Sequence, residues 1–205
     1  NNELRELFVA ERKEIERILA ELSADCANYR THIEENYRVL VTLDCIFARA
    51  KLSFAMNAIE PQIRTDGALE LKRARHPLID KQTVVPISVR LGTDFDTLII
   101  TGPNTGGKTV TLKTIGLLTL MAECGLHVPA DDGSFVSVFP LVLADIGDEQ
   151  SIEQSLSTFS AHMKNIVEIV SVCDSESLVL LDELGAGTDP AEGAALAVAL
   201  IEFCR

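Results

Sequence analysis

Apolar residues recur at intervals of three and four along the first sixty residues, which is the period of an amphipathic α-helix. In the first run, charged residues separate the apolar positions Leu4, Leu7, Phe8, Ile15, Ile18, Leu19 and Leu22. The second run has its apolar positions at Leu40, Leu43, Phe47, Ala50 and Phe54. Because proline disfavours helical backbone in the preceding residue, this second helix is expected to end near Glu60 and Pro61. Each helix has one narrow apolar stripe, so we expect the two to pack as an antiparallel pair.

After Pro61, short β-branched runs alternate with longer helical runs. The expected strands are residues 83–89, 97–100, 135–139, 141–144 and 178–181. The expected helices are residues 110–124, 158–173 and 190–205. This alternation predicts an α/β fold in which helices flank a mostly parallel sheet, preceded by an all-α segment. We place a helical domain at residues 1–60 and the α/β domain at residues 61–205.

Proline and glycine refine these elements. Pro86 lacks a backbone donor and favours an edge strand, whereas the unbroken apolar run at 97–100 favours a central, buried strand. Gly125 is expected to end a helix in the left-handed conformation, and Pro190 to occupy the first turn of another. A basic cluster of Lys72, Arg73 and Arg75 is interpreted as a salt-bridged or solvated turn, with contact to a phosphate backbone as the less favoured alternative.

Composition limits the classes of function. The chain has 205 residues and a formal net charge of -13, so its general surface is poorly suited to gripping nucleic acid, and any such contact must come from a local patch or from segments outside the chain. Its five cysteines, at 26, 45, 124, 173 and 204, include no Cys-x-x-Cys pair and are expected to be buried thiols in a reducing compartment. The chain has no apolar run of about eighteen residues and no signal-peptide pattern, which favours a cytoplasmic protein without membrane contact.

The segment Gly102 to Thr109 reads Gly-x-x-x-x-Gly-Lys-Thr between an apolar run and a helical one, which is typical of a phosphate-binding loop. Glycines let successive N–H groups converge on an anion, Lys108 can reach the outer phosphates, and the Thr109 hydroxyl can ligate Mg²⁺. A glycine-rich turn that binds nothing is the less favoured alternative. The expected nucleotide-binding residues are Gly102, Pro103, Asn104, Thr105, Gly106, Gly107, Lys108, Thr109 and Val110.

Two carboxylates follow the apolar run at 178–181. A parallel strand delivers its last residues to the sheet edge where phosphates bind, so Asp182 is expected to hold the Mg²⁺ shell together with Thr109. Glu183 is expected to orient or deprotonate the attacking water, which makes Glu183 and Lys108 the catalytic candidates. Without the glycine loop upstream, a simple strand cap would be the better interpretation of this pair.

Three motifs together resemble the ATPase domain of the MutS family of ABC-class ATPases. They are Thr101-Gly-Pro-Asn-Thr-Gly-Gly-Lys-Thr109, Ser157-Thr-Phe159 followed by Met163, and Leu181-Asp-Glu-Leu-Gly-Ala-Gly-Thr-Asp189. The run from Ile146 to Met163 and Gly-Ala-Gly-Thr-Asp-Pro at 185–190 are closer to the type-two bacterial branch than to the mismatch-recognising branch. The resemblance covers residues 69–205, and residues 1–60 are similar, with weaker motifs, to the core and lever helices of the family.

The resemblance implies ATP and Mg²⁺ as ligands and a homodimer in which each subunit completes the nucleotide site of the other. Ser157 and Thr158 would then address the terminal phosphate in the opposite subunit, and Asn104 would shape the loop and its water site. The segment from Gly185 to Asp189, and within it Gly187, Thr188 and Asp189, would lie at the dimer seam.

The type-two branch further implies that ATP hydrolysis drives a protein acting on branched or mismatched DNA, in control of recombination, with ribosomes as another partner. The family's histidine loop, dimerising segment and nuclease module are not in the sequence, so the ATPase domain is expected to be truncated on its C-terminal side. Two alternatives stay open. Another ABC-class ATPase with helical arms would carry Leu-Ser-Gly-Gly-Gln, which residues 155–159 do not match, and an ATP-gated dimerisation module would bind ATP without turnover.

Overall fold

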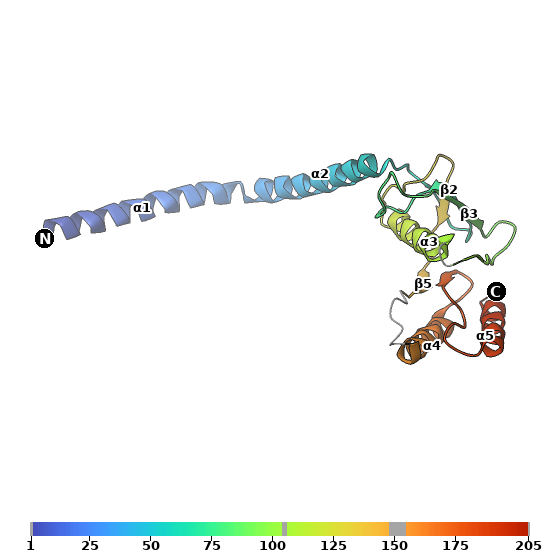
Figure 1. Cartoon of the computed structure of the whole chain (residues 1–205). Coiled ribbons are helices and arrows are strands. Elements are labelled where there is room, and N and C mark those ends of the chain that lie inside the picture. The colour runs from blue at the N-terminus through green and yellow to red at the C-terminus, as the bar shows by residue number, and fades with distance from the viewer. Residues whose placement is uncertain (1, 104–105, 148–154, 205) are drawn as a thin grey trace. The chain divides into compact units, whose positions relative to one another are not determined.

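The computed structural model describes residues 2–103, 106–147 and 155–204, with the backbone alone for residues 155–159 and 161. The chain divides into two compact units, residues 1–50 and residues 51–205 (Figure 1). Within the described part of the chain, no helix combines the length and the apolar character that crossing a membrane requires.

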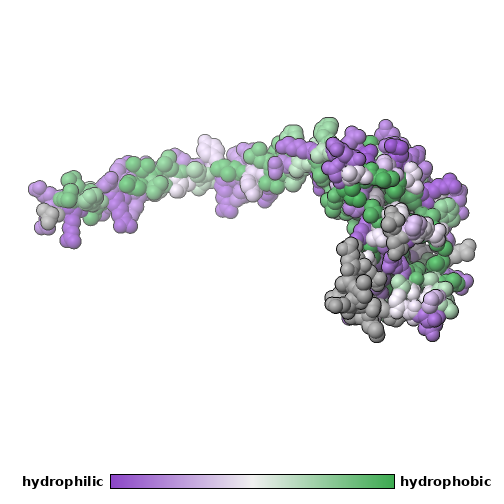
Figure 2. Space-filling view, viewed as in Figure 1, coloured by the Kyte–Doolittle hydropathy of each residue, from purple (hydrophilic) through white to green (hydrophobic). Residues whose placement is uncertain are grey.

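The first unit is helical. Helix α1 spans Asn2–Asn28 and α2 spans Arg30–Met56, with Tyr29 as the one non-helical residue between them. The prediction of an antiparallel pair is wrong, because a single linking residue leaves no loop for a reversal and every described residue up to position 50 is exposed. Figure 2 shows the consequence: apolar side chains lie among hydrophilic ones on the surface of this unit.

Asn57 ends α2 earlier than the predicted boundary at Glu60 and Pro61. Its backbone is left-handed, with φ 51°, and its N–H donates to the Phe54 carbonyl at 3.2 Å. The next N–H, of Ala58, donates to the Ser53 carbonyl at 2.9 Å. These two bonds form a Schellman motif with asparagine in the position that glycine most often takes. Helix α2 is therefore ended by an asparagine rather than by the proline downstream.

The second unit has a four-stranded sheet in the order β1-β4-β2-β3. Its strands are β1 (Gln62–Arg64), β2 (Leu69–Ala74), β3 (Ile87–Leu91) and β4 (Phe135–Ser137). Strand β1 pairs with β4 in parallel, whereas β2 is antiparallel to both β3 and β4. The strand that follows Pro86 lies at the edge of the sheet, as predicted.

A second sheet pairs β5 (Leu141–Asp145) in parallel with β6 (Ser177–Leu181). The described strands thus form two small sheets with both kinds of pairing, and the single mostly parallel sheet that we predicted is not found among them. The central strand expected at residues 97–100 is also absent: these residues are unpaired, and Leu98 and Ile99 are exposed. β-Branched sequence gives a propensity, but a strand forms only where a neighbour satisfies its backbone groups.

Helix α3 (Lys108–Glu123) supplies much of the core. Ile115 and Leu118 are buried with residues from both sheets, among them Leu71, Val136 and Leu180. Just after the end of the helix, Gly125 is left-handed as predicted, with φ 71°, and its N–H donates to the Ala122 carbonyl.

The remaining helices are α4 (Ser155–Val172) and α5 (Pro190–Phe203). Pro190 occupies the first turn of α5, as predicted, and the Asp189 side chain caps that helix by accepting from the Ala191 N–H at 2.9 Å.

The segment after α3 contacts the C-terminal end of α2. His127 Nδ1 and Ser53 Oγ share a hydrogen bond of 2.7 Å, and Ile59 and Val128 form an isolated antiparallel bridge. The turn after α3 is thereby joined to the residues that follow α2.

The basic cluster lies on and just after β2 rather than in a turn. Arg73 forms an ion pair with Asp131, with Nε and Oδ2 3.3 Å apart, which agrees with the salt-bridged interpretation. Arg75 donates to the Asn57 carbonyl at 2.7 Å.

The prediction of buried thiols is wrong. Cys173 is half-buried, and the other cysteines, Cys26, Cys45, Cys124 and Cys204, are exposed. They lie in or beside helices, at positions that do not face the core, so an apolar context did not imply burial.

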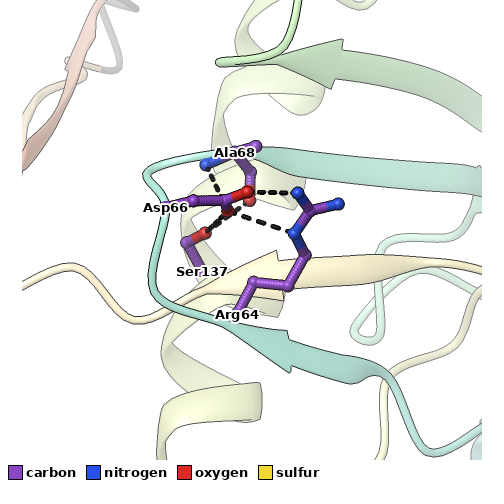
Figure 3. Close-up of polar contacts among 4 residues, drawn as sticks. All are labelled: Arg64, Asp66, Ala68 and Ser137. Carbon is purple, nitrogen blue, oxygen red and sulfur yellow. Dashed lines mark hydrogen bonds and ion pairs between the residues drawn. The ribbon is translucent and has the colours of Figure 1, made fainter.

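Asp66 ties the loop between β1 and β2 to β4 (Figure 3). Its carboxylate pairs with the Arg64 guanidinium and accepts hydrogen bonds from the Ser137 hydroxyl at 3.1 Å and from the Ala68 N–H at 3.3 Å. The Arg64 guanidinium also lies over the Phe135 ring, 4.4 Å from its centroid. The pairing with Arg64 is the main reason that the pKa of Asp66 is lowered below its ordinary value of 3.8.

Replacing Asp66 with Asn should lower the Tm at neutral pH, because the amide cannot pair with Arg64. An aspartate whose pKa is lowered in the folded state stabilises the fold at pH values above its ordinary pKa of 3.8. This contribution to stability is lost as the pH falls through the lowered pKa. The Tm difference should therefore shrink in that acidic range, as followed by circular dichroism. Asp132→Asn, which removes an exposed carboxylate in the turn before β4, is the control. Equal Tm changes for the two variants at neutral pH would contradict the assignment.

Candidate functional site

Two glycines of the glycine loop have open space beside them. Gly107 precedes α3 with φ 74°, and Gly102 has φ 147°. A Cβ built on either glycine would meet no atom within 4 Å, so space is present around both. Gly107 has no side chain with which to cap α3, and the N-terminus of a helix is a favourable position for an anion. Asn104 and Thr105 lie outside the described residues.

Lys108, the first residue of α3, folds back over this loop. Its Nζ donates to the Gly102 carbonyl oxygen at 2.6 Å. Lysine carries three donors on a flexible stem, so the ammonium group can move from this carbonyl to a phosphate oxygen without a change in the backbone.

The structure brings Thr109 and Asp182 together, although 73 positions separate them in sequence. The Thr109 hydroxyl donates to Asp182 Oδ2 at 2.5 Å. Asp182 follows β6 and is 7% exposed, and its N–H donates to the Asp145 carbonyl at the end of β5. A hydroxyl and a carboxylate side by side are the hard oxygen ligands that Mg²⁺ prefers, so this pair fits that ion. Val110, on the same first turn of α3, is 39% exposed.

Glu183 has an unusual backbone. Its φ is 47°, in the left-handed region that non-glycine residues rarely adopt, and its N–H donates to Asp182 Oδ1 at 3.0 Å. Such strain is concentrated at functional sites. Glu183 is exposed, so its carboxylate is available to a substrate beside Asp182.

A small pocket of about 20 Å³ lies against Asp182 and Glu183. This is enough space for about one water molecule. Asp145 and His162 also line the pocket, and His162 Nδ1 lies 2.9 Å from Asp145 Oδ2. The sequence analysis missed both residues. The available signal was that Asp145, like Asp182, is an aspartate at the carboxyl end of an apolar run.

Other predicted residues lie in separate elements. Ser157 and Thr158 belong to the first turns of α4, and their side chains are outside the described part of the structure. Gly187, with φ 83°, and Thr188 lie in the turn before α5. Asp189 is that helix's N-cap, so it already has a local structural role.

Comparisons with known proteins show the family of the chain. The family model for MutS domain V matches residues 98–205, which include the glycine loop, Asp182 and Glu183. The chain belongs to the MutS family. This MutS-family chain is 57% identical over all 205 residues to Endonuclease MutS2 of Acetivibrio thermocellus. It is 60% identical, over 98% of its length, to the proteins of that name from Pelotomaculum thermopropionicum and a Geobacillus species.

These relatives confirm the resemblance to the type-two branch of the MutS family. The alignments cover 26% of each of these relatives, so the chain spans about a quarter of their length.

Close packing between two glycines fixes the turn that follows Glu183 in this MutS-family chain. A Cβ on Gly193 would lie 2.5 Å from the Gly185 carbonyl oxygen, and Gly185 itself has φ 79°. The turn therefore rests directly on the backbone of α5.

In Gly193→Ala, the clash of the new Cβ with the Gly185 carbonyl should lower the free energy of unfolding by about 1–3 kcal/mol. The higher helix propensity of alanine should offset roughly 1 kcal/mol of this loss. Gly116→Ala is the matched comparison, because its Cβ would meet only the flexible end of Leu180, at 2.7 Å. Urea unfolding measures both changes. A Gly193 variant as stable as the Gly116 variant would contradict the role of this contact.

Proposed function

We propose that the chain binds Mg-ATP at the glycine loop and hydrolyses it, as the ATPase part of a dimeric, DNA-processing protein. The contact between Thr109 and Asp182 carries the proposal, because it joins the helix after the loop to the strand that ends in two carboxylates. Glu183, exposed and next in the chain, supplies the group that a hydrolase needs beyond binding.

The loop residues have distinct roles in this proposal. Backbone N–H groups of the loop and of the first turn of α3 surround the phosphates, and the ammonium group of Lys108 leaves the Gly102 carbonyl to contact the outer ones. Thr109 and Asp182 would hold Mg²⁺, which would neutralise charge on the phosphate oxygens when it is bound. The Thr109 hydroxyl donates its one proton to Asp182 and keeps two lone pairs on the oxygen, so it can ligate the ion while that bond stays formed.

Glu183 acts on water. The water oxygen forms a bond to the terminal phosphorus, the bond from that phosphorus to the bridging oxygen breaks, and its electron pair leaves with ADP. The proton released from the water passes to the Glu183 carboxylate and then to solvent.

A second subunit completes the site in this proposal. Ser157 and Thr158 would address the terminal phosphate bound by the partner, and Gly187, Thr188 and Asp189 would lie at the seam. DNA is the proposed target, supported by the name Endonuclease MutS2 that the relatives carry. Since the chain has a net charge of -13, DNA contacts would come from local basic groups or from segments outside the chain.

Lys108→Ala should abolish the thermal stabilisation given by Mg-ATP. Ligand at a hundred times its Kd stabilises a protein by about 2.7 kcal/mol, and this effect vanishes when the ligand does not bind. Differential scanning fluorimetry with and without Mg-ATP measures the change, and Lys81→Ala, which alters an exposed lysine in the same unit, serves as the control. An undiminished stabilisation of the Lys108 variant would remove the loop from the proposal.

Glu183→Gln should keep Mg-ATP binding and slow hydrolysis by about 10²- to 10⁴-fold, because the amide cannot accept the proton from water. Single-turnover assays with the chain in excess over ATP measure this, with Glu176→Gln as a control in the loop before β6. If the variant hydrolyses ATP at the wild-type rate, Glu183 is not the base. If the wild-type chain binds ATP but shows no turnover, the alternative of an ATP-gated dimerisation module is favoured.

A further inference from the structure

A histidine and an aspartate beside the ATP site have no role in the function proposed above. Asp145 ends β5 next to Asp182, and 5% of it is exposed. Helix α4 provides two donors to its carboxylate: His162 Nδ1 lies 2.9 Å from Oδ2, and Asn165 Nδ2 lies 2.8 Å from Oδ1. Asn165 Nδ2 is also 3.2 Å from the Ala144 carbonyl oxygen, so this amide donates both to the Asp145 side chain and to the backbone of β5.

These bonds fix which ring nitrogen of His162 carries the proton. An ionised carboxylate can only accept hydrogen bonds, so Nδ1 must donate to Asp145. In the neutral ring Nε2 then has a lone pair and acts as an acceptor. The Asp145 carboxylate thereby prepares an acceptor at the opposite edge of the imidazole.

His162 lines the small pocket, and its acceptor edge lies against Gly147, which lines the same pocket. A Cβ built on Gly147 would be 2.7 Å from His162 Cε1 and 2.9 Å from Nε2, so the ring approaches the backbone at a position where only glycine leaves room. Gly147 and His162 both line the pocket of about 20 Å³, together with Asp182 and Glu183. The His162 side chain is 27% exposed, which leaves the ring partly accessible.

We propose that His162 is the second acceptor for the water that Glu183 orients. This inference rests on the proposed ATPase function. A water molecule in the pocket donates one hydrogen to the Glu183 carboxylate and the other to His162 Nε2, which directs an oxygen lone pair at the terminal phosphorus. The water oxygen then bonds to phosphorus, the electron pair of the broken bond leaves with ADP, and the proton passes to Glu183. His162 keeps its proton on Nδ1 throughout, and Asp145 and Asn165 are positioning residues.

A purely structural role for His162 would be to fasten α4 to β5 through Asp145. Asparagine separates the two roles, because its amide nitrogen can take the place of Nδ1 and still donate to Asp145, whereas it has no atom in the place of Nε2. His162→Asn should therefore retain the Tm and the affinity for Mg-ATP. We expect kcat to fall by roughly tenfold, as for the loss of one hydrogen bond made to the reacting water, with KM unchanged.

The deciding experiment is nitrogen NMR of the imidazole rings in the whole chain, which has four histidines. The signals that disappear in His162→Asn identify His162. In the free chain in alkaline buffer, Nδ1 should show the shift of a protonated ring nitrogen and Nε2 that of an unprotonated one. Addition of Mg-ADP with fluoroaluminate, which mimics the transferring phosphate, should change the Nε2 signal, whereas Mg-ADP alone should not. His32→Asn, at an exposed position of α2, should leave both results unchanged.

The outcomes separate this inference from the proposed function. If the backbone amides of residues 102–110 do not respond to any nucleotide, the ATPase proposal itself fails. If those amides respond but the Nε2 signal does not, or if Nε2 is protonated in the free chain, the role of His162 is overturned while ATP binding stands. A turnover rate in His162→Asn equal to that of the wild type would also overturn it.

Discussion

The buried face of α3 is the constraint on which the second unit depends. Leu118 and Thr119 are fully buried, and a Cβ on Gly116 would lie 2.7 Å from Leu180 of β6, so the helix packs closely against residues of both sheets. Burying a hydroxyl is costly unless it finds a partner, and the Thr119 hydroxyl donates to the Ile115 carbonyl at 2.9 Å within the same helix. The helix can thus have polar residues on its buried face at little cost.

The packing of α3 also determines where the chemistry lies. Its first turn begins at Lys108 and its second residue, Thr109, reaches Asp182, so the position of the helix sets the distance between the glycine loop and the carboxylates of β6. The parallel pairing of β5 with β6 then places Asp145 beside Asp182, through the bond from the Asp182 N–H to the Asp145 carbonyl. Two aspartates from distant parts of the sequence become neighbours through one backbone contact.

Local chemistry was predictable from the sequence, and long-range pairing was not. Gly125, Pro190 and Pro86 act through their own backbone restrictions, and each behaves as the sequence predicted. A strand at 97–100 and a packed pair of α1 and α2 would each need a partner elsewhere in the chain, which no local pattern supplies. The helices were predicted, but the strand and the pairing were not found.

The candidate site divides in the same way. The motifs identify the glycine loop and the pair Asp182 and Glu183 because their spacing along the chain is itself the signal. Asp145 and His162 are 17 positions apart on a strand and a helix, and only the packing of α4 against β5 brings them together. Asn57 carries a weaker local signal, since asparagine can replace glycine at a helix end, and the proline downstream obscured it.

The bond between Ser53 and His127 gives α3 a mechanical property. At 16 residues the helix is about 24 Å long, with the glycine loop at one end and, just beyond the other, the turn that is fastened to the end of α2. A hydrogen-bonded helix transmits an axial push with little compression. A displacement of the first turn of α3 would therefore act on the turn that carries His127, which is bonded to Ser53 near the end of α2. Helix α3 thus spans the distance between the glycine loop and the turn that the hydrogen bond between Ser53 and His127 joins to the end of α2.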